Sequence, residues 1–371
     1  MRTKLRFLFL ALALFVGVYP ALAQLTNLGI APAGNQTVLF WPTTFTNYVL
    51  QSTTNLASPN WVLVTDAVPV TVSNAVTITV TNTSPARFFR LYNTNPPIGM
   101  ALIPAGVFTM GYSIGDSDIT DANPTNVYVS AFYMDTNLVS YSQWQLVYNW
   151  ATNHGYGFVH AGAGKAANHP VQTVDWYDTV KWCNARSQQA RLTPAYYADA
   201  GFTQVFTNGD GSTTVYLNLA NNGYRLPTEA EWEKAARGGL SGQRFPWGNT
   251  ISESQANYYG NTVISYDLGP NGYNAAFATG GYPYTSPVGS FAANGYGLYD
   301  MAGNVFEWCW DWYGIPYAGG SDPRGPPPGN NRVLRGGSWD RNALNARCAS
   351  RSYYIPYYPN YAVGFRCVRG L

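Results

Sequence analysis

Two carboxylates, Asp300 and Glu307, stand seven residues apart in a stretch that has neither the period of a helix nor that of a strand. This stretch, residues 287–313, is rich in aromatic side chains and is punctuated by Gly289, Gly295, Gly297 and Gly303. Glycine tolerates positive φ, so we expect bent, irregular backbone, buried by its aromatic side chains. Oxygen ligands on such a backbone suit Ca²⁺. Alternatively, both carboxylates only accept hydrogen bonds from loop amides, and spacing alone leaves the two interpretations open.

Sulfur and imidazole ligands are few. The chain has four cysteines and three histidines, His154, His160 and His169. No CxxC pair and no zinc-type spacing is present, so we expect the histidines to be structural or surface residues. No histidine stands near a serine in a recognised nucleophile pattern, although a hydrolytic site assembled only in space remains compatible with the sequence.

The N-terminus predicts export. Arg2, Lys4 and Arg6 precede an apolar run over 7–18, and Ala21-Leu22-Ala23 resembles a cleavage site. We therefore expect residues 1–23 to be a signal peptide cleaved after Ala23, and the mature protein to be secreted or periplasmic. A retained membrane anchor is the alternative, but the apolar run is shorter than the roughly 20 residues that span a bilayer.

The rest of the 371-residue chain predicts two domains. Residues 24–95 contain short β-prone runs separated by Asn, Pro, Ser and Thr, at 37–41, 48–51, 61–64, 76–80 and 88–92. They predict a small all-β module, a sandwich of five to seven strands, acting as a spacer or adhesive unit. Charged residues make up 11% of the chain and aromatic residues 16%, with a net charge of +2, so no nucleic-acid partner is expected.

The second domain, residues 98–371, opens with a strand and turn over 100–111. Three helices are predicted from their N-terminal caps: 140–152 after Ser140, 176–188 after Asp175, and 229–237 after Thr228 with Glu231. Residues 335–339 and 363–367 are expected to be closing strands. Between these elements Gly, Asn and Tyr predominate, which indicates an α+β domain with little regular secondary structure.

Several motifs carry a resemblance to a known family. They are IPAGVFTMG (103–111), HPVQTVDWYDTVKWCNA (169–185), YRLPTEAEWEKAARGG (224–239), FPWGN (245–249), RGGSW (335–339) and GFRCVR (364–369). In this order, over about residues 98–371, the chain resembles the formylglycine-generating enzymes, or sulfatase-modifying factors. The resemblance implies a variant of the C-type-lectin-like fold with bound calcium.

The family's enzymes oxidise a substrate cysteine to formylglycine with O₂ and a copper ion held by two cysteine thiolates, the ligands that Cu(I) prefers. The resemblance places those cysteines just after the RGGS motif. Here residues 339–346 contain no cysteine. Copper and the oxidase chemistry are therefore not expected. The family's iron-dependent members use a histidine set, which these three histidines do not supply.

The resemblance also implies disulfides. Cys183 and Cys367 match a structural disulfide of the family, and closing so long a loop stabilises by about 4–5 kcal/mol in the chain-entropy model. Cys348 matches half of a second disulfide, whose usual partner position is Ala236 here. Cys309 either pairs with Cys348, or both stay reduced as small apolar side chains.

The resemblance also supports the calcium prediction, at individual residues. Asp300, Gly303, Val305 and Glu307 fall on a family calcium loop, the acids with side chains and the other two with carbonyls. A second family site would use Asn257, Tyr258 and Tyr282, but Gly280 stands where its acid is expected, so this site is expected to be weakened or lost.

A tyrosine-rich segment, residues 350–361, follows the RGGSW motif. Tyrosine offers a broad contact surface with little rotamer entropy to lose. The segment therefore predicts a ligand-binding cleft for a peptide, protein or glycan. The same tyrosines are equally compatible with packing over the hydrophobic core. The cleft residues are Ser338, Trp339, Asp340, Arg341, Asn342, Tyr353, Tyr354, Tyr357 and Tyr358. Three hypotheses remain: a non-catalytic binding or scaffold protein, a formylglycine-generating oxidase, and an enzyme of unknown chemistry in the same cleft.

Overall fold

The computed structural model describes residues 28–44, 48–55, 62–81, 86–93, 96–112, 115–116, 118–211, 213–317 and 319–371. It divides into two compact units, Met1–Asn95 and Pro96–Leu371. The predicted signal peptide, residues 1–23, lies outside the described residues. No described helix is long and apolar enough to cross a membrane.

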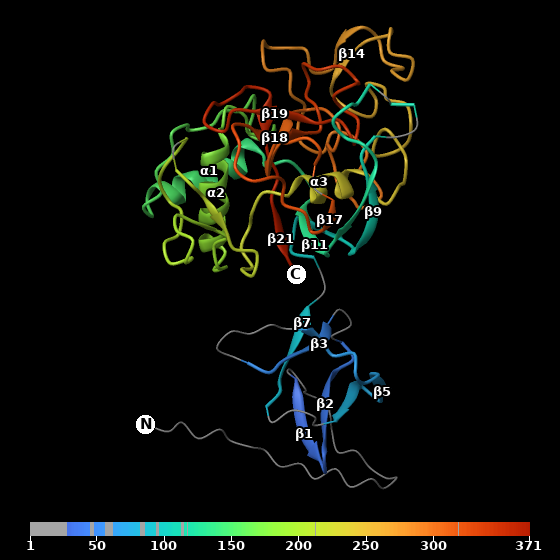
Figure 1. The fold of residues 1–371 in the computed structure, drawn as a ribbon, viewed down its shortest axis with the longest axis vertical. Coiled ribbons are helices and arrows are strands. Elements are labelled where there is room, and N and C mark those ends of the chain that lie inside the picture. The colour runs from blue at the N-terminus through green and yellow to red at the C-terminus, as the bar shows by residue number, and fades with distance from the viewer. Residues whose placement is uncertain are drawn as a thin grey trace. The chain divides into compact units, whose positions relative to one another are not determined.

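The N-terminal unit consists of short strands (blue in Figure 1). They are β1 (Gly29–Ala33), β2 (Gln36–Pro42), β3 (Tyr48–Thr53), β4 (Val62–Leu63), β5 (Val70–Val72), β6 (Ala75–Thr81) and β7 (Phe88–Asn93). One sheet has the order β1-β2-β6-β5 and the other β4-β3-β7. Both sheets contribute to one apolar cluster, formed by Leu39, Trp41, Leu50, Ile78 and Val80. The five β-prone runs correspond to five of these strands, whereas β1 and β5 carry no such run.

The Pro96–Leu371 unit has many short strands and, among its described residues, three helices. The helices are α1 (Tyr141–Thr152), α2 (Trp176–Gln189) and α3 (Glu229–Ala236). The predicted caps are confirmed: Ser140, Asp175 and Thr228 each accept a hydrogen bond from a backbone N–H in the first turn, and Thr228 forms a capping box with Glu231.

The strands of this unit form small sheets rather than one large one. Its strands are β8 (Met100–Ile103), β9 (Gly106–Met110), β10 (Thr125–Val129), β11 (Phe132–Asp135), β12 (Tyr196–Tyr197), β13 (Tyr216–Leu217), β14 (Tyr259–Gly260), β15 (Gly272–Tyr273), β16 (Phe306–Trp312), β17 (Gly320–Ser321), β18 (Arg332–Arg335), β19 (Ser352–Tyr354), β20 (Val363–Gly364) and β21 (Val368–Gly370). The sheet orders are β17-β10-β9, β21-β11-β8, β19-β18-β16-β20, β12-β13 and β14-β15.

Both strand predictions near the C-terminus, 335–339 and 363–367, were too long. Of residues 335–339 only Arg335 is in a strand, because Gly336 (φ 93°) and Gly337 (φ 74°) turn the chain in the left-handed region. Of residues 363–367 only Val363–Gly364 is a strand, and the chain re-enters a sheet at Val368.

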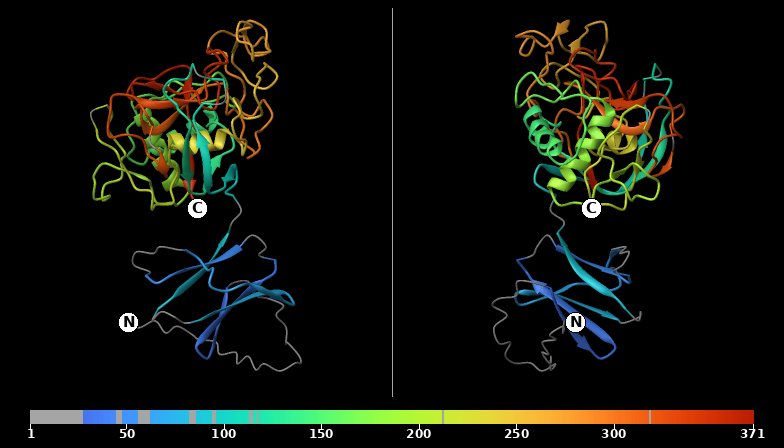
Figure 2. Two further views of the ribbon diagram at one scale, coloured as in Figure 1. Left: turned by 45° about the vertical axis from the view of Figure 1, so that its right-hand side comes forward. Right: turned by 90° about the vertical axis from the view of Figure 1, so that its left-hand side faces the viewer.

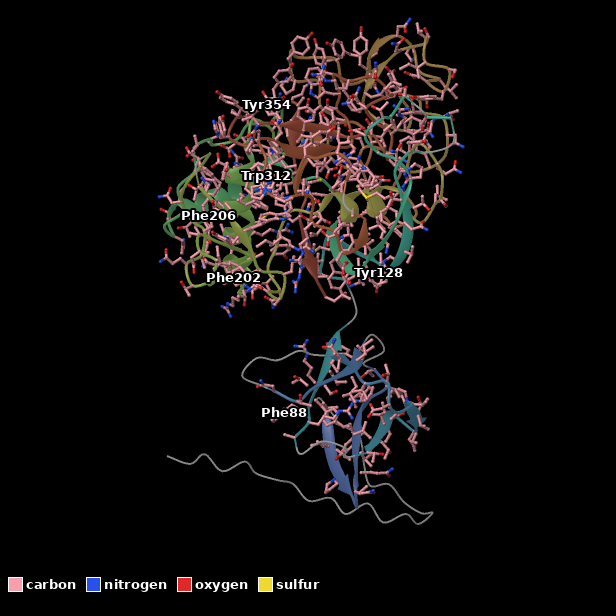
Figure 3. All side chains as sticks on the ribbon, viewed as in Figure 1. Phe88, Tyr128, Phe202, Phe206, Trp312 and Tyr354 are labelled. Atoms are coloured by element: carbon pink, nitrogen blue, oxygen red, sulfur yellow. The ribbon has the colours of Figure 1, made fainter. Side chains whose placement is uncertain are left out.

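Large aromatic side chains fill the core between the helices and sheets. Figure 2 shows α1 and α2 side by side, and their contact stacks Trp144 on Trp182 with ring centroids 5.9 Å apart. Phe365 meets both indoles edge-on, at 6.0 and 5.3 Å. Figure 3 labels Trp312 and Tyr354 in this unit; they belong to β16 and β19, the two strands on either side of β18 in the four-stranded sheet.

Candidate functional site

The turn after β18 presents the RGGSW motif. Gly337 allows close packing, because a Cβ on it would lie 3.0 Å from the Ala346 nitrogen. Beyond the turn, the Ser338 hydroxyl donates a 2.6 Å hydrogen bond to Oδ1 of Asp340. Trp339 is 1% exposed, and within the described part of the chain its Nε1 has no hydrogen-bond partner. The turn therefore fixes a buried indole beside a partly exposed carboxylate.

Trp339 is the centre of an aromatic cluster, which we define as Tyr259, Tyr273, Tyr282, Tyr284, Trp339 and Tyr361. The ring centroids of Tyr273, Tyr282, Tyr284 and Tyr361 lie between 5.4 and 5.8 Å from that of Trp339. Tyr259 meets Tyr273 at 4.8 Å, across the β14-β15 pair. Because the tyrosines pack around the buried indole of Trp339, that side chain holds the cluster in place.

The cluster has an exposed face with polar groups on it. Tyr282 is 66% exposed and Tyr361 53% exposed. The Tyr361 hydroxyl lies 3.4 Å from Oδ2 of Asp340, and the negative charge of Asp340 raises the pKa of Tyr361. A hydrogen bond with Tyr282 raises the pKa of Tyr273 to about 12. The raised pKa values favour the neutral, hydrogen-bonding form of the Tyr361 and Tyr273 hydroxyls.

The structure brings together only part of the predicted cleft. Trp339 and Asp340 are in or beside the aromatic cluster. Tyr353 instead packs on Tyr313 at 4.4 Å, and Tyr357 packs on Tyr358 at 4.9 Å. Tyr354 contacts Trp308 at 6.3 Å. Arg341 is exposed, and Asn342 accepts hydrogen bonds within its own turn, from Leu344 and Asn345.

Sequence reasoning missed three members of the cluster, Tyr259, Tyr273 and Tyr284, and counted Tyr282 only as a metal ligand. Their signal was the density of tyrosines over residues 258–284. No local pattern connects that segment to the RGGSW motif. The connection is a tertiary one, made in part by the backbone hydrogen bond from Tyr259 to the carbonyl of Arg341.

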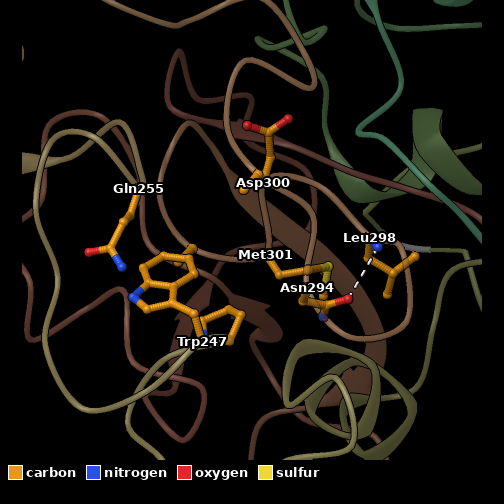
Figure 4. A pocket seen from close by; sticks show the side chains of 9 residues that line it. Trp247, Gln255, Asn294, Leu298, Asp300 and Met301 are labelled. Atoms are coloured by element: carbon orange, nitrogen blue, oxygen red, sulfur yellow. Dashed lines mark hydrogen bonds between the residues drawn. The ribbon is translucent and has the colours of Figure 1, made fainter.

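The predicted calcium loop places one carboxylate well for a cation. Asp300 is buried with a φ of 55°, and its Oδ2 accepts a 2.7 Å hydrogen bond from the Gly289 N–H. Its Oδ1 has no hydrogen-bond partner among the described residues. Burial raises the pKa of Asp300 to about 6. Figure 4 shows its carboxylate pointing away from Met301 and Trp247. An orphaned buried oxygen fits a metal ligand.

The rest of that loop fits calcium only in part. Both oxygens of Glu307 are engaged by the buried Arg366 guanidinium, at 2.7 and 3.0 Å. Gly303 has a φ of 79°, and a Cβ there would lie 2.3 Å from the Asn257 carbonyl oxygen. Val305 is fully buried. Asp300 therefore fits a cation, whereas Glu307 already has a positive partner.

The second predicted calcium site is less suited to an ion. The Asn257 amide donates to the Tyr284 carbonyl at 2.8 Å, and the Asn257 carbonyl accepts from the Asn304 N–H at 2.7 Å. The Tyr258 hydroxyl donates to Asp267. Asn257 and Tyr258 are thus engaged in structural hydrogen bonds, and Tyr282 belongs to the aromatic cluster.

All four cysteines are buried thiols in the structure. The sulfurs of Cys183 and Cys367 lie 3.5 Å apart, and the predicted bridge between them stays a prediction. Cys309 and Cys348 belong to the same apolar cluster as Ala236. Burial raises the pKa of Cys348 to about 12 and that of Cys309 well above its usual value. Burial in the apolar core therefore favours the neutral thiol form of both side chains.

Comparisons with known proteins agree on one family. A family model described as the sulfatase-modifying factor enzyme 1-like domain matches residues 89–371. The formylglycine-generating enzyme of Bos taurus is 34% identical over 296 residues, which cover 74% of this chain and 75% of that protein. Chaperone protein LppX of Paenibacillus barcinonensis is 33% identical over 250 residues, covering 67% of this chain and 80% of that protein.

Solved structures show the same fold. Treponema denticola variable protein 1 matches with a TM-score of 0.59 and 28% identity, covering 82% of this chain and 99% of that one. The crystal structure of CarF matches with a TM-score of 0.56 and 29% identity, covering 74% of this chain and 99% of that one. The few helices and many short strands are consistent with the C-type-lectin-like fold.

Proposed function

We propose, from the premise that this chain belongs to the sulfatase-modifying factor enzyme 1-like family, that it is a non-catalytic binding protein whose ligand contacts the aromatic cluster. The family match confirms the resemblance carried by the motifs. The observation that carries the proposal is the position of Trp339. It directly follows Ser338, in the segment where the resemblance implies copper-binding cysteines, and it holds a partly exposed group of tyrosines instead.

The chemistry of the cysteines supports the non-catalytic half of the proposal. A Cu(I) site needs accessible thiolates. Residues 339–346 contain no cysteine, and the four cysteines of the chain are buried. Cys183 lies in α2, Cys309 in β16, and Cys348 and Cys367 beyond the RGGSW turn.

The alternative function is that of a formylglycine-generating oxidase, and the 34% identity to the Bos taurus enzyme favours it.

To test this alternative, residues 24–371 would be incubated with copper, a reductant, O₂ and a sulfatase-type peptide, and mass spectrometry would look for the aldehyde. We expect none above a no-enzyme control. The formylglycine-generating enzyme of Thermomonospora curvata, 34% identical to this chain, is the positive control. Aldehyde made by this chain would reinstate the oxidase hypothesis.

The composition of the cluster supports the binding half. Exposed tyrosines supply rigid contact area, and a Trp or Tyr at the centre of an interface commonly contributes about 2 kcal/mol or more. The carboxylate of Asp340, 3.4 Å from the Tyr361 hydroxyl, adds a directional polar group beside the rings. We propose a peptide, protein or glycan as the ligand, held by ring contacts and oriented by this carboxylate.

A glycan and peptide array tests the binding half. We expect a ligand whose affinity falls about 30-fold on Tyr282→Ala or Tyr361→Ala, corresponding to about 2 kcal/mol. Tyr128→Ala is the matched control, since Tyr128 is 38% exposed on β10, outside the cluster. Array ligands that bind the Tyr282 and Tyr361 variants as well as the unaltered protein would place recognition elsewhere and contradict the proposal.

We further propose that the protein is exported after cleavage at Ala23, that residues 24–95 form a β-sandwich spacer or adhesive module, and that structural calcium binds at Asp300. The N-terminal charge and hydropathy pattern supports export. The apolar cluster shared by the two N-terminal sheets supports the module. The unpartnered Oδ1 of Asp300 supports the calcium.

A further inference from the structure

A histidine and two aspartates converge at the N-terminus of α2. Nδ1 of His160 lies 3.2 Å from Oδ2 of Asp175 and 3.1 Å from Oδ2 of Asp178. The three ligating atoms lie within 4.8 Å of one another. Asp175 and Asp178 are fully buried, whereas the His160 side chain is 24% exposed. The group therefore has two carboxylates inside the protein and an imidazole that closes it toward solvent.

Asp178 is fixed by protein groups before any ligand arrives. Its Oδ2 accepts a 2.7 Å hydrogen bond from the His160 N–H, and its Oδ1 accepts one of 3.0 Å from the Val159 N–H. Lys181, one turn further along α2, places its ammonium 2.9 Å from Oδ1. That ammonium is held in turn by two backbone carbonyls, those of Gly157 and Gly209. The backbone around His160 is thus held in place against α2.

Asp175 is held by one oxygen only. Its Oδ1 caps α2 by accepting a 2.6 Å hydrogen bond from the Asp178 N–H. Its Oδ2 is buried and receives no hydrogen bond from any residue that the structure describes, although it lies 3.2 Å from Nδ1 of His160. A buried carboxylate oxygen without a donor costs free energy unless a cation meets it.

The two buried carboxylates are unequally paired with cations. Lys181 lies on the far side of Asp178, with its ammonium 2.9 Å from Oδ1. Among the described residues, no Lys or Arg forms an ion pair with Asp175, whose only close basic neighbour is the His160 ring. Buried charges in proteins are normally paired or bound to metal.

We propose that His160, Asp175 and Asp178 form a zinc site, with water as the fourth ligand on the exposed side of His160. One nitrogen and two carboxylate oxygens are borderline-to-hard ligands that suit Zn²⁺. Zinc bonds of about 2.0–2.2 Å in a tetrahedron separate neighbouring ligands by about 3.3 Å. The separations of 3.1 and 3.2 Å from Nδ1 to the two oxygens match that edge.

The same geometry is poorer for the competing arrangement, a protonated His160 held between the aspartates. A single Nδ1–H donates well in one direction. Here the two acceptor oxygens are nearly equidistant from Nδ1, and only the contact with Asp178 has hydrogen-bond geometry. A metal ion between the three atoms satisfies all of them at once. Ca²⁺ is disfavoured, because it prefers six to eight oxygen ligands.

To test the proposal, residues 24–371 are titrated with Zn²⁺ alone, and isothermal titration calorimetry measures the affinity. Metal analysis after gel filtration then measures how much zinc each chain retains. We expect one zinc per chain, a rise in thermal midpoint on binding, and at least a 10-fold loss of affinity in His160→Ala and Asp175→Asn. Asn caps a helix as well as Asp does, so Asp175→Asn removes the ligand charge and keeps α2 capped.

His154→Ala is the matched control. Nδ1 of His154 lies 2.7 Å from the Trp150 carbonyl and its ring stacks on Trp150, away from any carboxylate contact among the described residues. We expect this variant to bind zinc as the unaltered protein does. Absence of zinc binding, or equal binding by His160→Ala and Asp175→Asn, would overturn the proposal. In either case the group would be a charge-paired histidine that anchors the loop to α2.

Discussion

At the scale of single residues, backbone conformation and burial decide what the Asp300 loop can do. Asp300 and Gly303 both have positive φ, so the loop doubles back on itself within four residues. Glycine is needed at position 303 for space as well as for conformation, because of the Asn257 carbonyl. Among the described residues, Oδ1 of Asp300 accepts no hydrogen bond of normal geometry, although the Asn304 side chain lies close enough to lower the pKa of Asp300. The loop therefore depends on one glycine and has one carboxylate available for a cation.

Substituting Gly303 tests the close approach. Gly303→Ala adds a Cβ 2.3 Å from the Asn257 carbonyl oxygen, in addition to the strain of a left-handed alanine. We expect the free energy of unfolding to fall by about 2–4 kcal/mol, measured by urea denaturation. Gly297→Ala is the control: its φ of 78° matches the 79° of Gly303, but no atom lies within 4 Å of its Cβ. An equal loss in both variants would show that conformation alone matters.

Asp300 gives a prediction about pH and calcium. Its pKa is raised to about 6 by burial, above the value of about 3.9 in an unfolded chain. The folded state therefore binds the extra proton, and this residue adds stability as the pH falls from 7 toward 4. In EDTA, the unaltered protein should gain stability relative to Asp300→Asn on going from pH 7 to pH 5.

At neutral pH, Ca²⁺ should stabilise the folded protein at Asp300, as a proton on Asp300 does at low pH. At pH 7 we expect Ca²⁺ to raise the thermal midpoint of the unaltered protein and not that of Asp300→Asn, in which Asn still tolerates a positive φ. Differential scanning fluorimetry with Ca²⁺ or EDTA measures both. The same calcium-dependent rise in the two proteins would exclude Asp300 as a ligand.

At the scale of elements, α3 acts as a buried anchor for distant parts of the chain. Its acidic side chains all point to arginines from other segments or from its own end: Glu229 to Arg351, Glu231 to Arg225, and Glu233 to both Arg237 and Arg335. A helix of eight residues has little stability by itself. These ion pairs and its capping box therefore hold α3 in place, and α3 holds β18 and the RGGSW turn.

Removing one of these charges should be costly. Glu233→Gln leaves the fully buried Arg335 without its full counter-charge, and we expect a loss of about 3–5 kcal/mol in the free energy of unfolding. Asp118→Asn is the control, since Asp118 also pairs with an arginine, through two hydrogen bonds from Arg347, but is 53% exposed. It should change stability by less than about 1 kcal/mol. Similar losses in both would show that burial does not set the cost.

At the scale of the whole molecule, the C-terminal segment returns to the start of the Pro96–Leu371 unit. β21 pairs with β11, and Cys367 lies beside Cys183 of α2. The two cysteines come from parts of the chain that are far apart in sequence, and export, as proposed above, would expose them to an oxidising environment. A covalent bond between them would close a long loop of the chain.

We expect the exported protein to contain a Cys183–Cys367 disulfide. Peptide mapping by mass spectrometry without reductant should recover the linked pair, and intact mass should show a chain beginning at Gln24. Cys183→Ala with Cys367→Ala should lower stability by up to about 4–5 kcal/mol in the chain-entropy model. Cys309→Ala, a buried thiol in another apolar cluster, controls for the loss of packing. Unlinked Cys183 and Cys367 in oxidised, exported protein would contradict the prediction.

The sequence by itself determined the family, the three helices and the lack of cysteine after RGGS. These features depend on local sequence. A helix cap such as Thr228 with Glu231 involves residues within one helical turn, and the absence of cysteine from a segment does not depend on the fold. The five β-prone runs were likewise predictable, because alternation along a strand is local. The weak strand β1, with glycine and proline in it, was not.

Only the tertiary structure decided which side chains meet. Trp339 contacts Tyr273, Tyr282 and Tyr284. Tyr353 and Tyr354 lie elsewhere, because they belong to β19, which pairs with β18. His160 reaches Asp175 and Asp178 because the loop before α2 folds back onto the helix N-terminus. Contacts between irregular segments depend on where each glycine turns the chain in three dimensions, and no residue spacing encodes that.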